Sequence, residues 1–148
     1  MDPPMEILSS RIFAVPPARL FGMFGDPSRL CAWWGPSGFT CTFHEFDFRP
    51  GGKWRFTMHG PDLKDYENEK TFVEIVEPER IVFDHSEPMH SFRMTMDYSP
   101  LAKGKATRLT WRMAFEEGAG NEKFRDFIAV ANEQNFDRLE AQLQETTP

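Results

Sequence analysis

The sequence predicts a single α+β domain, residues 1–148, in which an antiparallel sheet is covered by one long helix at the carboxyl end of the chain. Three segments between residues 53 and 115 alternate apolar and polar side chains, which is typical of antiparallel strands with one buried face. The final segment lacks proline and glycine and repeats apolar residues at helical spacing. No linker, repeat or low-complexity tract divides the chain, so one core is expected.

A strand and two short helices are predicted at the amino end. Residues 5–13 read as a strand that ends at a pair of prolines. Proline is tolerated in the first turn of a helix, so a short helix is expected from Pro17. Asp26 is then predicted to cap a second helix that begins with Pro27 and ends at Gly35.

The segment from Phe39 to Phe115 is predicted to be antiparallel sheet. Its clearest strands are residues 53–59, 91–98 and 107–115, and a hairpin loop is expected at 100–105. In each of these strands every second side chain is apolar, which predicts one buried and one solvent-facing side.

Two further strands are predicted at residues 66–76 and 80–85. In the first, both faces carry apolar side chains, so alternation does not decide which face is inward, and a bulge would change the register. Both possibilities stay open: one face holds Glu67, Glu69, Val73 and Ile75, and the other holds Tyr66, Asn68, Lys70 and Phe72.

Residues 121–144 predict one long amphipathic helix. A sheet that is wet on one side needs a cover on its other side, and this helix is the only long element available. Its apolar residues at helical spacing are Phe124, Phe127, Ile128, Ala131, Leu139 and Leu143.

Composition excludes several classes of protein. The chain has 15 Phe, 4 Trp and 8 Met although its mean hydropathy is −0.53, so its apolar content is concentrated in large side chains. A net charge of −6 is opposite to that of a nucleic-acid binder. No apolar run is long enough to cross a membrane, and the first residues do not resemble a secretory signal, so a cytoplasmic protein is expected. Cys31 and Cys41 are expected to be reduced, structural thiols.

Several short motifs accompany this order of elements. They are Asp26-Pro27, Trp33-Trp34-Gly35-Pro36, Arg49-Pro50-Gly51-Gly52-Lys53-Trp54, His59-Gly60-Pro61 and Glu77-Pro78-Glu79-Arg80-Ile81-Val82-Phe83. With them, roughly residues 8–143 resemble the bacterial single-domain members of the Hsp90 ATPase activator homologue 1-like family. That family lies in the START/Bet v 1-like superfamily, also called polyketide cyclase/dehydrase-like or SRPBCC.

The resemblance implies a helix-grip fold. In this fold a curved antiparallel sheet, of six or seven strands here, wraps around the carboxy-terminal helix, with two short helices beside it and a cavity between sheet and helix. Superfamily members bind lipids, hormones or polyketide intermediates there, and some catalyse cyclisation or hydrolysis. The shared motifs are turns and packing positions, so they carry no catalytic signature.

Aromatic and methionine side chains on the strand faces are the candidate ligand-binding residues. They form stripes whose natural partner is the apolar face of the final helix. A filled core explains them equally well, but methionine suits an adaptable pocket wall. The predicted ligand-binding residues are Trp34, Trp54, Phe56, Met58, Phe83, His85, Phe92, Met94, Trp111, Met113, Phe127 and Ala131, with Tyr98 and Asn135 as further candidate polar groups.

His85 and Glu69 are the candidate catalytic residues. His85 shares strand parity with Ile81 and Phe83, so it is expected to face the same space and to be able to transfer a proton near neutral pH. If Glu69 faced the cavity beside it, the two would form an acid/base couple. His44, His59 and His90 show no metal-ligand spacing, and no phosphate loop, dinucleotide fingerprint or other cofactor motif occurs, so neither metal nor cofactor is expected.

Three functions therefore compete. The first is binding of a small apolar or aromatic molecule between sheet and helix. The second is a cyclase- or hydrolase-type enzyme that uses His85 and a carboxylate in the same cavity. The third is a module that binds a chaperone, as the eukaryotic Hsp90 activator does. No nucleic-acid or membrane partner is expected, and an exposed sheet edge would permit a homodimer.

Overall fold

The computed structural model confirms the α+β architecture, and it describes residues 5–87, 91–115 and 122–145. These residues form one long helix, two short helices and seven strands. In chain order they are β1 (Met5–Phe13), α1 (Pro17–Gly25), α2 (Pro27–Trp33), β2 (Thr40–Phe46), β3 (Lys53–His59), β4 (Asp65–Val76), β5 (Arg80–Glu87), β6 (Phe92–Leu101), the 3-10 turn η1 (Ala102–Gly104), β7 (Ala106–Phe115) and α3 (Glu122–Glu145).

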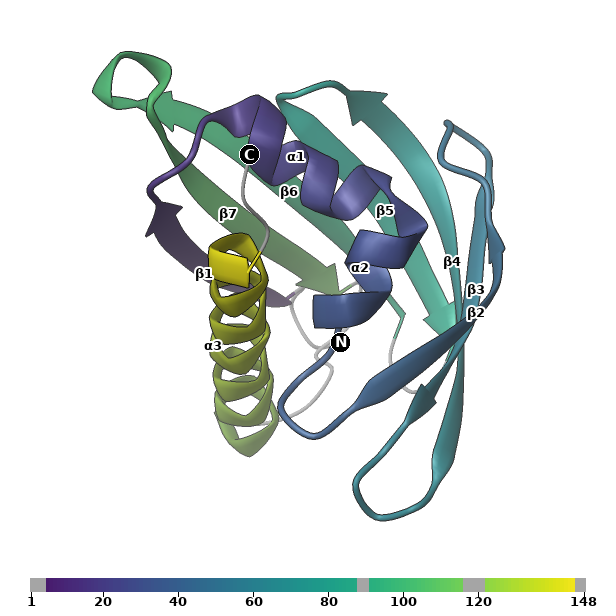
Figure 1. Ribbon diagram of the computed structural model, residues 1–148. Helices are drawn as coiled ribbons and strands as arrows, with labels where there is room; N and C mark the ends of the chain where they lie inside the picture. Colours follow the sequence, from purple (N-terminus) through teal and green to yellow (C-terminus); the bar gives the residue numbers. More distant parts are fainter. Residues whose placement is uncertain (1–4, 88–90, 116–121, 146–148) are drawn as a thin grey trace.

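The seven strands form one antiparallel sheet in the order β1-β7-β6-β5-β4-β3-β2. Strands β2 to β7 follow one another as neighbours, whereas β1 pairs with β7 at the far edge. The segment that contains α1 and α2 must therefore cross from one edge of the sheet to the other, and it does so over the same face as α3 (Figure 1). A homodimer through either edge stays a prediction.

The proline-started helices form as their sequences predict. The Asp26 carboxylate accepts a hydrogen bond from the backbone N–H of Ser28 (3.0 Å), which caps α2. α2 ends at Trp33, and Trp34 continues in an extended conformation. The indole of Trp33 donates to the Met23 carbonyl of α1 (2.9 Å), so the two short helices are joined as one unit.

The Gly51-Gly52 turn sets the position of β4 beside β3. Gly51 has a φ of +84°, and a Cβ at Gly52 would clash with the Asp47 carbonyl oxygen, so the turn requires both glycines. Gly51 donates to the Phe72 carbonyl (2.8 Å), and the Phe72 N–H donates to Gly52 (2.9 Å). These bonds fix Phe72 opposite the turn, with its side chain buried against the core.

One half of the concave face is filled by an aromatic cluster. Phe24 of α1 lies at its centre, and seven rings have their centroids 5.3–6.5 Å away: Trp33, Trp34, Phe46, Phe48, Trp54, Phe72 and Phe83. The sequence analysis paired Trp54 and Phe56 with the final helix. The structure gives Trp54 a different partner, since α1 and the α2 end cover its ring.

α3 packs against the sheet mainly through its second half. Its buried residues are Asn132, Asn135, Phe136, Leu139 and Leu143. Phe136, which the predicted apolar face omitted, contacts Trp111 with ring centroids 4.7 Å apart. In the first half, Phe124 contacts Phe115 of β7, whereas Phe127 is 64% exposed, so this part of the helix is only partly packed against the sheet. The predicted helix start at residue 121 lies outside the described residues.

Candidate functional site

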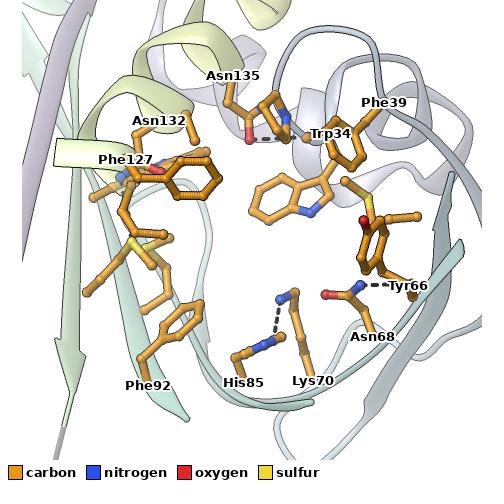
Figure 2. Close-up of a pocket in the computed structure, with 18 of the residues that line it drawn as sticks. Trp34, Phe39, Tyr66, Asn68, Lys70, His85, Phe92, Phe127, Asn132 and Asn135 are labelled. Atoms are coloured by element: carbon orange, nitrogen blue, oxygen red, sulfur yellow. Dashed lines mark hydrogen bonds between the residues drawn. The ribbon is translucent and has the colours of Figure 1, made fainter. Parts of the chain in front are cut away.

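A cavity of about 390 Å³ lies between the first half of α3 and the concave face of the sheet. Its walls come from the Trp34–Phe39 segment, from β3 to β7 and from α3 (Figure 2). Most lining side chains are aromatic or aliphatic. The lining residues are Trp34, Gly35, Pro36, Phe39, Met58, Tyr66, Asn68, Lys70, His85, Phe92, Met94, Trp111, Met113, Phe115, Phe124, Phe127, Ile128, Ala131, Asn132 and Asn135.

Nine of the twelve predicted ligand-binding residues line this cavity. They are Trp34, Met58, His85, Phe92, Met94, Trp111, Met113, Phe127 and Ala131. The other three, Trp54, Phe56 and Phe83, are at most 1% exposed and lie in the packed aromatic half of the concave face, behind the cavity wall. The same face of the sheet therefore has a filled half and an open half.

Lys70 is a buried lysine whose ammonium group faces the cavity (Figure 2). It follows the inward parity of Asn68 and Phe72 on β4, and its side chain is only 4% exposed. Its Nζ lies 5.1–6.0 Å from the centroids of five aromatic rings: Trp34, Trp54, Phe56, Phe83 and Phe92. Burial lowers the pKa of Lys70 from 10.5 to about 7.

His85 lies directly beside this lysine. It is paired with Lys70 across β4 and β5, and its Nδ1 is 2.8 Å from Lys70 Nζ. The imidazole is buried and stacks on the Phe92 ring, with centroids 4.7 Å apart. When Lys70 is charged it donates this hydrogen bond, and when Lys70 is neutral the imidazole N–H can donate instead.

Glu69 does not lie beside His85. Its carboxylate is half-exposed on the opposite face of β4, 3.8 Å from Lys53 Nζ. The strand alternates, so an inward Lys70 places its neighbour Glu69 outward. The side chain that contacts His85 in the cavity is therefore the basic Lys70, and the predicted pair of a carboxylate and an imidazole does not form.

Two asparagines of α3 bound the cavity on the helix side. Asn135 donates to the Trp33 carbonyl (2.8 Å) and accepts from the Gly35 N–H (3.3 Å), which attaches α3 to the end of α2. Asn132 donates to Ser9 Oγ of β1 (3.1 Å). Tyr98, the third predicted polar group, packs against Phe21 of α1 and is not among the lining residues.

Sequence reasoning missed Lys70 and several other lining residues. The lining residues other than Lys70 that the predicted set omits are Gly35, Pro36, Phe39, Tyr66, Asn68, Phe115, Phe124, Ile128 and Asn132. Lys70 shares parity with Phe72, which was a usable signal, but a lysine faces solvent by default. Asn132 is three residues before Asn135 on α3, so helical spacing could have found it once Asn135 was suspected.

The remaining histidines lie away from the cavity. His44 contacts Thr57 (2.7 Å), and His59 contacts Asp65 (2.8 Å), both on the outer side of the sheet. His90 lies outside the described residues. Within the described ranges, no three His, Cys, Asp or Glu side chains are grouped so that they could hold a metal ion. No helix in the described part of the chain is long and apolar enough to cross a membrane.

Solved structures of similar fold come from several bacteria. A protein from Arthrobacter aurescens superposes with a TM-score of 0.85 at 24% identity, covering 96% of this chain and 87% of that one. A Chromobacterium violaceum protein gives 0.82 at 23% identity, with 94% and 96% covered. The AHSA1 protein from Silicibacter pomeroyi gives 0.79 at 21% identity, with 95% and 99% covered. At these identities the likeness concerns the fold alone.

Sequence comparison gives the family. No curated protein matches the chain. Residues 14–144, however, match the family model described as activator of Hsp90 ATPase homolog 1-like protein, which extends from the end of β1 almost to the end of α3. Domains of this superfamily typically enclose a ligand-binding cavity, and the cavity described above lies in the corresponding place between sheet and helix. The chain belongs to the activator of Hsp90 ATPase homolog 1-like family, within the START/Bet v 1-like (SRPBCC) superfamily.

Proposed function

We propose that this protein binds a small, largely apolar or aromatic molecule in the cavity between α3 and the sheet. The observation that carries the proposal is the open half of the concave face. There, Phe127 stays 64% exposed although it lines a cavity of about 390 Å³. A plain core would fill such a space with side chains, as the aromatic cluster around Phe24 does.

The chemistry of the walls supports an apolar guest. Phe92, Trp111 and Phe115 offer ring faces, and Met58, Met94 and Met113 offer flexible thioethers. Small-molecule sites usually combine such apolar walls with a few polar groups, which here are Lys70, His85 and the asparagines. A molecule that removes these walls from water gains about 25 cal/mol per Å² of apolar surface buried.

A neutral fluorescent probe, N-phenyl-1-naphthylamine, tests the proposal. We expect a saturable rise in its fluorescence with the unaltered protein. Ala131→Trp places an indole in the cavity from α3, so it should weaken binding at least about tenfold, equivalent to about 1.4 kcal/mol. Phe127→Ala should weaken binding several-fold, because it removes one apolar wall of the cavity. The variant should still fold, because Phe127 is 64% exposed.

Val130→Trp is the matched control. Val130 precedes Ala131 on α3 but is 56% exposed and does not belong to the lining residues, so this variant should bind like the unaltered chain. A probe that shows no saturable binding to the unaltered chain, or that binds Ala131→Trp as well as Val130→Trp, contradicts the proposal.

A further inference from the structure

The charge that faces the cavity is opposite in sign to the net charge of the chain. The chain as a whole carries a net charge of −6, yet the charged group that faces the cavity is the Lys70 ammonium. No Asp or Glu occurs among the described lining residues. The two glutamates that precede Lys70 on β4 lie on the outer face: Glu67 accepts from Thr57 Oγ1 (2.9 Å), and Glu69 faces Lys53.

The other titratable groups that the structure describes near Lys70 supply no anion at neutral pH. The imidazole of His85 is either neutral or positively charged, so it is not an anion. Burial raises the pKa of the Cys41 thiol to about 12, so it stays protonated. The Tyr66 hydroxyl donates to the exposed Asp62 carboxylate (3.0 Å), and this bond raises the pKa of Tyr66. The buried ammonium is therefore held by aromatic faces and one imidazole, without a carboxylate partner among these groups.

Such a cation has donors to offer to a guest. A lysine ammonium carries three N–H donors, and the hydrogen bond to His85 uses one of them. Ring faces stabilise the charge only partly, so an anion bound beside it would gain a charge-assisted hydrogen bond in a site of low dielectric constant. The rings of Trp34, Phe92 and Trp111, which line the cavity, would at the same time contact an apolar body.

We propose that the cavity takes molecules with an apolar or aromatic body and one carboxylate, and that the Lys70 ammonium, positioned by His85, binds the carboxylate. This inference rests on the proposed function, because it names the chemical class of the molecule that the same cavity binds. The carboxylate would lie at the sheet side of the cavity, where Lys70 and His85 stand together, and the apolar body would lie toward α3 (Figure 2).

Two probes of equal ring size separate the carboxylate from the apolar body: 2-naphthoate and the neutral 2-naphthalenemethanol. Calorimetric titration at about pH 6, below the Lys70 pKa of about 7, keeps the ammonium charged. We expect the unaltered chain to bind 2-naphthoate at least about tenfold more tightly than the alcohol. In Lys70→Met, which keeps an unbranched apolar stem but removes the ammonium group, the two affinities should agree within about threefold.

Lys53→Met is the control for charge. Lys53 lies on the neighbouring strand β3 but on the outer face, half-exposed, so its loss should leave the preference for 2-naphthoate intact. Equal binding of both probes by the unaltered chain overturns this inference and leaves the proposed function standing. Binding of neither probe overturns both. Retained preference in Lys70→Met overturns the assignment to Lys70, and the comparison on the unaltered chain needs no variant to fold.

Discussion

At the scale of single residues, Lys70 is the most unusual feature of the molecule. Burial of this lysine, which is 4% exposed, removes its hydration shell. Its contacts with five ring faces and one imidazole compensate for only part of the hydration free energy that is lost. Its lowered pKa is the measure of this cost, since burial disfavours the charged form. Residues that serve a bound molecule are often kept at the expense of stability.

Replacing Lys70 by Met should therefore stabilise the protein. Below about pH 7 the lysine is protonated in both folded and unfolded chains, so the folded state carries the full cost of burying the charge. Between pH 7 and 10.5 the folded lysine loses its proton while the unfolded one keeps it, so the stability of the unaltered chain rises. The variant should be more stable by roughly 1–4 kcal/mol at about pH 6, and this gain should shrink toward pH 10.

Denaturant unfolding of both proteins across this pH range measures the difference. Groups that titrate alike in the two proteins contribute nothing to this difference, so it reports only the groups whose titration changes when Lys70 is removed. A variant that is less stable than the unaltered chain at about pH 6, or a difference that does not vary with pH, would contradict the cost assigned to Lys70.

At the scale of elements, α3 is divided into two halves with different tasks. The second half packs through Phe136, Leu139 and Leu143, which are buried against the sheet and the short helices. The first half forms a cavity wall and contacts the sheet through Phe124, whose ring centroid lies 5.7 Å from that of Phe115. Asn135 lies at the boundary, where its amide bonds to the Trp33 carbonyl and the Gly35 N–H at the end of α2.

Truncation of Asn135 should loosen this junction. Asn135→Ala leaves a carbonyl and an N–H in a buried place without the amide that satisfies them, so the free energy of unfolding should fall by roughly 1–3 kcal/mol. The neighbouring Gln134 accepts from the Ser37 N–H (3.2 Å) at an exposed position, and Gln134→Ala should cost less than about 0.5 kcal/mol. Chemical unfolding of the two variants tests the contrast, and equal losses would show that Asn135 does not fasten α3 to α2.

At the scale of the whole molecule, one curved sheet supports two environments. α1 and α2 press the aromatic cluster onto one half of the concave face, and α3 spans the other half without closing it (Figure 1). The half of the concave face under α1 and α2 stabilises the fold through dense packing, and the half under α3 leaves space for a bound molecule.

This division predicts opposite outcomes for two phenylalanines. Phe83 is 0% exposed in the packed half, so Phe83→Ala should cost roughly 3–5 kcal/mol of unfolding free energy. Phe127 is 64% exposed at the cavity, so Phe127→Ala should change stability by no more than about 0.5 kcal/mol while it weakens probe binding. Thermal unfolding with and without the naphthylamine probe measures both effects, and a large loss for Phe127→Ala would mean that this half is packed as well.

The local sequence was sufficient to predict the helices and strands and, for most strands, which face is buried. Alternation in 53–59 and 107–115 predicted the buried apolar side chains, because adjacent residues of a strand point to opposite sides; Thr57 on the outer side is buried as well. Asp26 and Pro27 predicted the start of α2, because capping depends on neighbouring residues only. The motifs at 33–36 and 49–54 also led to the correct family.

Only the tertiary structure decided what lies inside the site. In β4 both faces carry apolar residues, and register shifts against β5 fall beside Lys70 and Phe72, so no periodicity could show that Lys70 turns inward and Glu69 outward. Trp54 and Trp111 look alike in sequence, yet one is sealed under α1 and the other lines the cavity. Strand periodicity determines the side of a sheet to which a residue points, whereas the element that covers that side, and the space it leaves, follow from how distant segments pack together.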